Sequence, residues 1–228
     1  MPSKPIRVVT LISGRGTNML ALAERTASGE LVEVVGVFSN EARAAGIDAA
    51  SERGLYTQII AHRDYAERAQ FDDALRDAID RLAPDLIVLA GFMRILTPPF
   101  INHYQGRLIN IHPSLLPNYP GLNTHERALQ DKAKEHGATV HFVTDELDGG
   151  PRIAYAKVAV NTEDSANELA ARVLHREHQL LPTVVEWFAA GRLALTEQGA
   201  CLDQHLLTTP VEVNNLTRRN CHPTIAQT

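Results

Sequence analysis

Hydrophobic residues along the chain form short continuous runs, and amphipathic segments lie between them. Residues 6–12, 32–38 and 86–89 are runs of mainly aliphatic side chains. Such runs are typical of strands that are buried on both faces of a sheet. Residues 69–82 instead place apolar side chains three or four positions apart, as one face of a helix requires. The pattern therefore predicts buried strands that alternate with surface helices.

The order of these elements predicts the fold class. Further helices are expected at 19–28 and 42–53, and a further strand at 56–60. Strands that alternate with helices indicate an α/β fold with a doubly wound, mostly parallel sheet and a Rossmann-like N-terminal half. Strands at 138–143 and 153–160 form an antiparallel extension around an acidic loop.

A long C-terminal helix follows this extension. Asp164 or Ser165 is expected to cap it, Pro182 to kink it, and Ala190 to lie near its end. Short strand-like pieces come next, and we expect the tail 208–228 to be flexible. Neither an internal repeat nor a linker is visible, so residues 1–228 are predicted to form a single domain with halves of about 1–104 and 105–207.

The composition narrows the class of protein. The 228 residues are 44% hydrophobic with a formal net charge of −5, which argues against nucleic-acid binding by bulk charge. Cys201 and Cys221 form no CxxC motif, so a reducing compartment is the default. The N-terminus lacks a signal-peptide pattern, and the longest apolar run, 86–93, is too short to span a bilayer. We expect a soluble cytoplasmic protein that acts on small molecules.

The strand predicted at 108–112 ends in a segment that is rich in proline. Pro113, Pro117 and Pro120 follow it, and proline cannot continue the strand. Asn110 and His112 are two positions apart and therefore point to the same side of the strand. The Asn amide can donate to an oxyanion, and the His ring can carry a proton near neutral pH. These two side chains indicate a catalytic edge, unless they only satisfy local backbone groups.

A glycine turn, Gly14–Asn18, joins the first strand to its helix. Backbone N–H groups at a helix start can bind a phosphate, although a tight turn also needs glycine for its dihedral angles alone. The third glycine of a dinucleotide fingerprint would fall at Met19, and no Gly-Lys-Ser/Thr follows. A mononucleotide or a sugar phosphate therefore fits this turn better than NAD or ATP.

Two further segments are candidates for the same edge. Ligands of open α/β sheets bind at the carboxyl ends of the strands, where Gly14–Asn18, Gly91–Leu96 and Asn110–His112 all fall. Gly91–Leu96 either lines a pocket for a flat heterocycle or is a hydrophobic connector. The loop Asp145–Pro151 either brings Asp148 to the mouth of the site or is a solvated acidic turn.

Four motifs carry a resemblance to a known family. ISGRGTN, AGFMRIL, INIHPSLLPNYPG and HFVTDELDGGP occur in this order. The chain resembles the folate-dependent glycinamide ribonucleotide formyltransferases of purine synthesis over roughly residues 6–205. Methionyl-tRNA formyltransferases carry an added C-terminal domain and formyltetrahydrofolate deformylases an added N-terminal one, and we expect neither here. The chain departs from the family at Asn123, where many relatives have His.

The resemblance implies a reaction, its co-substrate and its residues. A formyl group would pass from 10-formyltetrahydrofolate to the amine of N1-(5-phospho-D-ribosyl)glycinamide. The implied catalytic residues are Asn110, His112 as the proton donor, and Asp148, which would raise the pKa of His112. The residues implied to bind the ribonucleotide are Gly14, Arg15, Gly16, Thr17, Asn18 and Glu177. Those implied to bind the folate are Arg68, Met93, Arg94, Ile95, Leu96, Asn110, Thr144, Asp145, Glu146, Leu147 and Asp148.

No metal is expected, because the formyl donor is already activated and because His175 and His178 lack a third ligand in the sequence. Two other functions stay open at this point. One is hydrolysis of the formyl donor by water, and the other is a non-catalytic folate or nucleotide-phosphate binding domain. The protein is expected to be a monomer or a homodimer.

Overall fold

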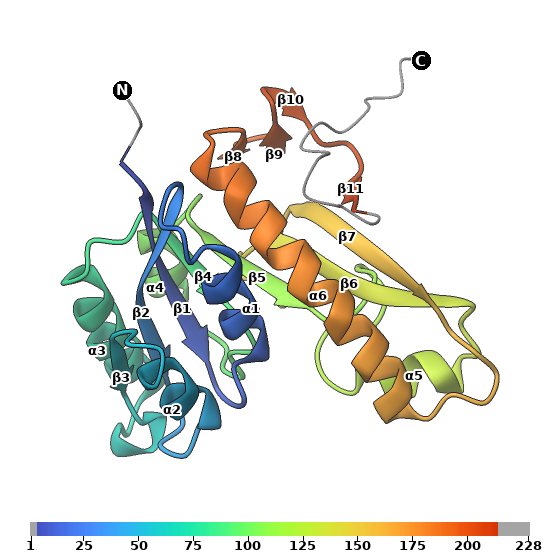
Figure 1. The fold of residues 1–228 in the computed structure, drawn as a ribbon, viewed down its shortest axis with the longest axis horizontal. Coiled ribbons are helices and arrows are strands. Elements are labelled where there is room, and N and C mark those ends of the chain that lie inside the picture. Colours follow the sequence, from blue (N-terminus) through green and yellow to red (C-terminus); the bar gives the residue numbers. More distant parts are fainter. Residues whose placement is uncertain (1–3, 214–228) are drawn as a thin grey trace.

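The computed structural model describes residues 4–213, which form a large sheet with helices on both faces (Figure 1). The main sheet has eight strands in the order β11-β7-β6-β5-β4-β1-β2-β3, and β10, β9 and β8 form a separate sheet of three strands. The strands are β1 Ile6–Ile12, β2 Val32–Ser39, β3 Thr57–Ile59, β4 Leu86–Leu89, β5 Leu108–His112, β6 Glu135–Phe142, β7 Arg152–Ala159, β8 Leu193–Thr196, β9 Gly199–Leu202, β10 His205–Leu206 and β11 Val211–Glu212. The helices are α1 Thr17–Arg25, α2 Ala45–Ser51, α3 Arg68–Asp80, α4 Pro98–His103, α5 Thr124–Gln130 and α6 Ala166–Ala189, with a 3-10 turn at His62–Asp64.

The strand directions confirm the predicted α/β fold with its antiparallel extension. β1 to β5 run parallel to one another, whereas β6 is antiparallel to both β5 and β7. In the register of β5 and β6, Asn110 lies opposite His141 and His112 lies opposite Thr139. The carboxyl end of β5 therefore faces the middle of β6, which brings residues distant in sequence to the same place.

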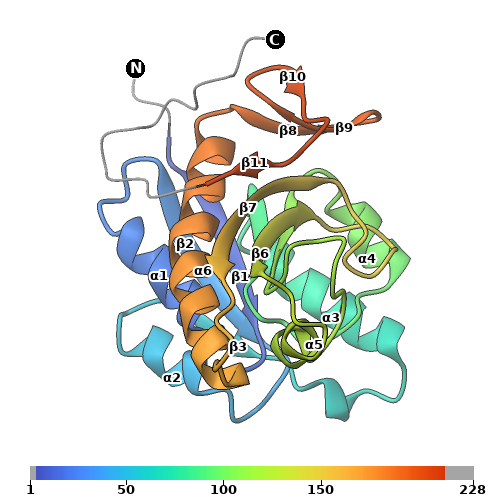
Figure 2. The same cartoon turned by 90° about the vertical axis from the view of Figure 1, so that its right-hand side faces the viewer.

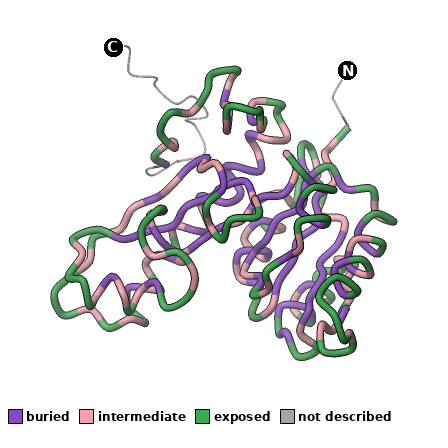
Figure 3. The backbone as a smooth tube through the Cα atoms, turned by 180° about the vertical axis from the view of Figure 1, so that it is seen from behind, coloured by how far each residue is buried: buried purple, intermediate pink, exposed green. Residues whose placement is uncertain are grey.

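The sheet separates two hydrophobic cores. Figure 2 shows α1, α2 and α6 on one face of the sheet and α3 and α4 on the other. Successive β1 residues alternate between the cores, because Val8 and Ile12 belong to the first and Val9 and Leu11 to the second. Coverage on both faces explains why the strands read as continuous apolar runs, and Figure 3 shows these strands as the most buried part of the chain.

The helix α6 packs along the sheet and joins its two halves. It contacts α1, β6 and β7, and it lies diagonally across the view in Figure 1. Ser165 caps its N-terminus, as predicted, in a reciprocal pair with Glu168. α6 runs through Pro182 as one element, so the predicted kink does not divide it. None of the helices within residues 4–213 is both long and apolar enough to cross a membrane.

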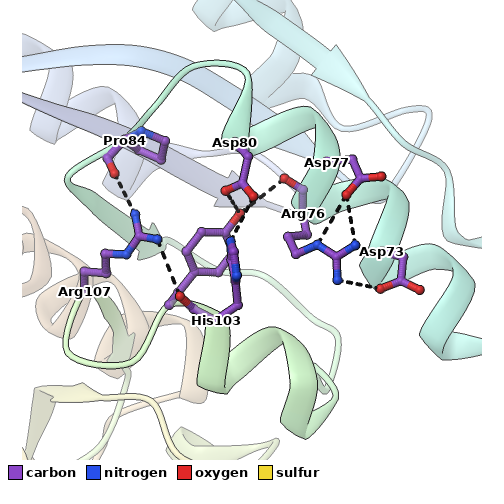
Figure 4. Close-up of polar contacts among 8 residues, drawn as sticks. Asp73, Arg76, Asp77, Asp80, Pro84, His103 and Arg107 are labelled. Atoms are coloured by element: carbon purple, nitrogen blue, oxygen red, sulfur yellow. Dashed lines mark hydrogen bonds and ion pairs between the residues drawn. The ribbon is translucent and has the colours of Figure 1, made fainter.

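A polar cluster joins α3 to α4 and includes Arg107, the residue that precedes β5 (Figure 4). The carboxylate of Asp80 accepts hydrogen bonds from the Tyr104 hydroxyl at 2.8 Å and from His103 Nε2 at 2.8 Å. Arg107 donates to the Pro84 carbonyl oxygen at 2.9 Å. The Tyr104 ring is fully buried. These contacts fix the segment that enters β5, the strand that carries Asn110 and His112.

Several elements differ from the sequence-based expectation. α4 and α5 were not predicted, because each is short and α4 begins with two prolines, which are tolerated only in a first helical turn. α2 covers only Ala45–Ser51 of the predicted 42–53, and β3 covers only Thr57–Ile59. Within the tail predicted to be flexible, Val211–Glu212 adds strand β11 to the main sheet. The rest of that tail, 214–228, lies outside the described residues.

We predict that Ser165→Ala lowers the free energy of unfolding by about 1 kcal/mol, because the side chain that accepts the Glu168 N–H is lost. Urea denaturation of the two proteins measures this difference. Ser51→Ala is the matched control, since Ser51 is exposed at the end of α2. Equal losses in both variants would show that the cap does not stabilise α6.

Candidate active site

The three predicted segments meet at the carboxyl edge of the parallel strands. Ser13, the residue after β1, links two of them: its N–H donates to the Gly91 carbonyl oxygen at 2.9 Å, and its Oγ accepts from the Met93 N–H at 2.7 Å. Gly46 N–H donates to the Gly14 carbonyl oxygen at 3.0 Å. The glycine turn therefore lies beside the segment that follows β4.

Gly16 is required at its position by both conformation and space. Its φ is +67°, a left-handed value that glycine adopts readily, and a Cβ there would lie 3.1 Å from the Gly46 Cα. α1 begins at the next residue, Thr17, and the first N–H groups of a helix have no intrahelical acceptor. The turn thus needs glycine for its geometry and also presents donors to an anion.

Glu177 lies against this turn, although it is far away in the sequence. Asn18 Nδ2 donates to Glu177 Oε2 at 2.6 Å, and only 7% of Glu177 is exposed. Burial raises the pKa of the Glu177 carboxyl, and the hydrogen bond from Asn18 opposes this rise. The structure thus brings Asn18 and Glu177 together at the start of α1, while Arg15 is exposed beside them.

His112 is the last residue of β5, as predicted, and its ring lies between two hydrogen-bond acceptors. Nε2 is 2.9 Å from the Tyr119 carbonyl oxygen, and Nδ1 is 3.4 Å from Asp148 Oδ2. A carbonyl oxygen only accepts, so Nε2 carries the hydrogen in the neutral ring. Nδ1 can then take a second proton that faces the carboxylate. The Tyr119 carbonyl oxygen thus orients the ring, and Asp148 can stabilise the positive charge that forms when Nδ1 is protonated.

Burial decides the protonation of His112 in the ligand-free protein. It lowers the pKa of His112 and outweighs the Tyr119 carbonyl and the Asp148 carboxylate, which both raise it. Asp148 therefore acts in the predicted direction, but the pKa of His112 is below its ordinary value of 6.5 and not above it. The resemblance implied a raised pKa for His112, and that expectation is corrected: in the ligand-free protein burial favours the neutral ring.

Asp148 keeps its charge although its side chain is almost fully buried. Burial raises the pKa of its carboxyl, but the Gly121 N–H and the neighbouring His141 and His112 rings, in their protonated forms, lower it below the usual range. Oδ2 accepts from Gly121 N–H at 2.8 Å, and Oδ1 lies 3.7 Å from His141 Nε2. The acidic loop is thus not simply solvated, because it directs one carboxylate towards His112.

A cavity lies beside this group, between the segment after β4 and the acidic loop. The predicted folate residues in its wall are Arg94, Ile95, Leu96, Asn110, Thr144, Asp145, Glu146, Leu147 and Asp148. The other lining residues are Leu89, Phe92, Ile101, His141 and Val143. Phe92 lies in the predicted segment Gly91–Leu96, whereas the sequence analysis assigned no role to the other four. The side chains of Leu89, Phe92, Leu96 and Ile101 are buried, so the cavity has an apolar floor.

Two residues predicted to bind the folate lie outside this wall. Met93 is 66% exposed, and its backbone N–H is used by Ser13. Arg68 is the exposed first residue of α3. Arg68 and Met93 were predicted to bind the folate from the family resemblance, and a resemblance in sequence does not give the direction of a side chain.

Asp72 is a buried carboxylate that the sequence analysis missed. Its Oδ2 accepts from the Thr97 N–H at 2.6 Å, so it fixes the end of the segment that lines the cavity. Burial raises the pKa of Asp72, whereas its hydrogen bonds with Thr97 and the charge of Arg94 lower it. The sequence feature that could have indicated a buried carboxylate is the position of Asp72 directly after Phe71, a residue on the apolar face of α3.

The remaining predictions concern Asn123 and metal ligands. Asn123 precedes α5 with φ of +56°, a left-handed conformation that Asn tolerates better than most residues. Within residues 4–213, no group of three or more His, Cys, Asp and Glu side chains is placed to hold a metal ion. His178 lies on α6, and its buried Nε2 has no hydrogen-bond partner among the described residues.

Comparison with known proteins identifies the family. A family model for formyl transferases matches residues 6–185. The chain belongs to the formyl transferase family. This formyl transferase is 49% identical to the phosphoribosylglycinamide formyltransferase of Escherichia coli (strain K12), and the match covers 87% of this chain and 94% of that protein. The solved phosphoribosylglycinamide formyltransferase from Coxiella burnetii is 45% identical, with a TM-score of 0.88, over 92% of this chain and 100% of that chain.

A solved formyltetrahydrofolate deformylase from Pseudomonas syringae is more distant. It is 25% identical to this formyl transferase, with a TM-score of 0.80, over 88% of this chain and 67% of that chain. The resemblance predicted from the four motifs is therefore confirmed, and the closer likeness is to the transferases.

We predict that Asp148→Asn lowers the pKa of His112 further, because an anionic neighbour favours the charged ring and an amide does not. An NMR titration of the His112 ring measures the change. Asp145→Asn is the matched control, since it makes the same substitution at an exposed position of the same loop. An unchanged His112 pKa in Asp148→Asn would show that the two groups are not coupled.

Proposed function

We propose that this protein transfers the formyl group of 10-formyltetrahydrofolate to the amine of N1-(5-phospho-D-ribosyl)glycinamide. The products are the N2-formyl ribonucleotide and tetrahydrofolate, in de novo purine biosynthesis. The observation that carries the proposal is that the glycine turn after β1 and the cavity lined by Asn110 lie at the same carboxyl edge of the parallel strands as His112. A transferase needs two substrates at one point, and this edge of the sheet offers a place for each.

The glycine turn is the proposed site of the ribonucleotide phosphate. Gly14–Asn18 lies at the start of α1, where backbone donors and the helix dipole favour an anion. Arg15 is exposed beside the turn and adds a positive charge. Glu177, held by Asn18, offers a carboxylate to the ribose hydroxyls or to the amine.

The cavity beside Asn110 is the proposed site of the folate ring. Its wall contains buried apolar side chains together with Asn110, His141 and Asp148. Its volume is about 100 Å³, below the roughly 300–1,000 Å³ of common small-molecule sites. Entry of a bicyclic ring therefore requires exposed side chains of the cavity wall to move outward. Leu147 and Ile95 are each 56% exposed, so they provide apolar surface to close over the ring.

Asn110 would act on the oxygen of the formyl group. When the amine nitrogen forms a bond to the formyl carbon, the electrons of the C=O bond move to its oxygen, which becomes negative. An amide N–H placed in advance stabilises this charge by several kcal/mol when water is excluded. Asn110 lines the cavity and is the donor nearest to His112 along β5.

His112 would move one proton between the two nitrogens. The amine nitrogen becomes positive when it attacks, and a neutral His112 can accept its proton. The resulting imidazolium is stabilised by Asp148 and then donates that proton to the folate nitrogen as the bond from this nitrogen to the formyl carbon breaks. The net step consumes no proton, so the lowered pKa of the free ring suits the reaction.

The His112 ring is bonded on both sides, so one of its two hydrogen-bond acceptors must be displaced before a ring nitrogen can contact a substrate. Tyr119, whose carbonyl oxygen binds Nε2, has φ of +57°, an unusual value for a large side chain. We propose that the substrates replace this carbonyl and that the neutral ring then carries its hydrogen on Nδ1, facing Asp148. Nε2 is then unprotonated and can accept the proton of the amine. Every group in this scheme comes from one chain, so the scheme applies to a monomer and a homodimer alike. We propose a reducing, cytoplasmic location, which suits Cys201, a free thiol within residues 4–213.

We expect formyl transfer to exceed hydrolysis of the donor by orders of magnitude when the ribonucleotide is present. The phosphate site positions the amine, and well-oriented groups reach effective molarities of roughly 10⁵ M or more. Consumption of 10-formyltetrahydrofolate, measured with and without the ribonucleotide, tests this expectation. Glycinamide without the ribose phosphate is the control, and it should lose kcat as well as affinity.

Equal donor consumption with and without the ribonucleotide would contradict the transferase function and favour a deformylase. No turnover under either condition, with both ligands bound, would favour a non-catalytic binding domain. These outcomes separate the three functions that the sequence left open.

A further inference from the structure

His141 is a buried histidine in the cavity wall, and the scheme above gives it no role. It lies on β6 directly opposite Asn110, and only 2% of it is exposed. Its Nδ1 is 2.8 Å from the Phe142 carbonyl oxygen, and its Nε2 is 3.1 Å from Asn110 Nδ2. The same Nε2 is 3.7 Å from Asp148 Oδ1. His141 therefore touches both an Asn and an Asp of the proposed catalytic group.

These contacts define the hydrogen positions on the ring. The Phe142 carbonyl oxygen only accepts, so Nδ1 of His141 carries a hydrogen. The Asn110 Nδ2 only donates, so Nε2 of His141 must accept. A neutral ring with its hydrogen on Nδ1 satisfies both contacts at once.

The same contacts define the orientation of the Asn110 amide. If the amide turned over, its oxygen would face the unprotonated Nε2, and two acceptors would meet at 3.1 Å with no hydrogen between them. In the observed orientation, one Nδ2–H is given to His141 and the second remains for another acceptor. The His141 ring thus selects which end of the amide is available.

We propose that His141 is a positioning residue that holds the Asn110 amide with an N–H, and not its oxygen, available to the formyl oxygen. The inference rests on the proposed role of Asn110. A turned amide would present an acceptor to an oxygen that becomes negative, which would destabilise the transition state.

The neutral ring of His141 has a second consequence, for Asp148. A protonated His141 would carry a hydrogen on Nε2 and direct it to Asp148 Oδ1, which is the nearest carboxylate oxygen. The carboxylate would then be shared between two cations. With a neutral His141, the negative charge of Asp148 interacts mainly with His112, whose Nδ1 lies 3.4 Å from Oδ2.

The first test is spectroscopic and needs no variant. Protein labelled with 15N in its histidines reports which ring nitrogen carries hydrogen, through the 15N shifts and their couplings to the ring protons. We expect Nδ1 of His141 to be protonated and Nε2 to be unprotonated at neutral pH. A hydrogen on Nε2, in a neutral or a charged ring, would overturn the proposal.

The second test is a double-mutant cycle in kcat. We expect His141→Leu to lower kcat by roughly 10²-fold, the scale for a misplaced reacting group, with little change in the KM of the ribonucleotide. His141→Gln, which keeps an acceptor, should recover part of kcat. In an Asn110→Ala background, His141→Leu should cost much less, because the group that it positions is gone. His205→Leu, which makes the same substitution at an exposed histidine of the separate three-stranded sheet, is the control and should keep kcat.

The outcomes separate this inference from the proposed function. Full additivity of the two substitutions, or a wild-type kcat in His141→Leu, would overturn the positioning role and leave the function intact. A wild-type kcat in Asn110→Ala would contradict the proposed role of Asn110 and the inference with it. Thermal unfolding of each variant identifies a loss that comes only from misfolding, and the spectroscopic test then decides.

Discussion

The ring of His112 is held between a backbone carbonyl and a buried carboxylate, and much of the structure serves to bring those two acceptors together. The carbonyl belongs to Tyr119, in the loop that begins where Pro113 ends β5, and the carboxylate belongs to Asp148, in the loop between β6 and β7. Asp148 also accepts the Gly121 N–H, so the two loops hold each other. The antiparallel pairing of β5 with β6 sets this meeting point, because it carries the chain back past the end of β5.

Burial and charge oppose each other at this point. Burial favours the neutral form of His112, and Asp148 favours the charged form, with burial the stronger of the two in the free protein. A ring in this condition is suited to accept a proton during the reaction and to give it away again, whereas a permanently charged ring could only donate. The stabilising groups are already in place when the charge forms, so little reorganisation is needed.

The sequence predicted the parallel sheet, the antiparallel extension, the cap at Ser165 and the strand end at His112, because each leaves a local pattern of apolar, capping or proline residues. It also predicted that Asp148 would approach His112, through family motifs more than through spacing. It missed His141 and Asp72, since a polar residue inside an apolar run shows its partner only when the fold is known. The direction of the His112 pKa shift was also missed, because burial depends on all the surrounding elements. Arg68 and Met93 lie outside the cavity for a similar reason: a motif fixes positions along the chain and not the directions of side chains.

The central claim is the proposal that one edge of the sheet binds two substrates next to Asn110 and His112. A crystal structure with the ribonucleotide and a folate analogue that cannot transfer its formyl group tests it most directly. The account predicts the phosphate at the backbone N–H groups of Gly14–Asn18 and the folate ring in the cavity beside Asn110. It also predicts that Asn110 Nδ2 lies about 3 Å from the formyl oxygen. A phosphate bound away from the glycine turn, or a folate ring outside the cavity, would contradict the account.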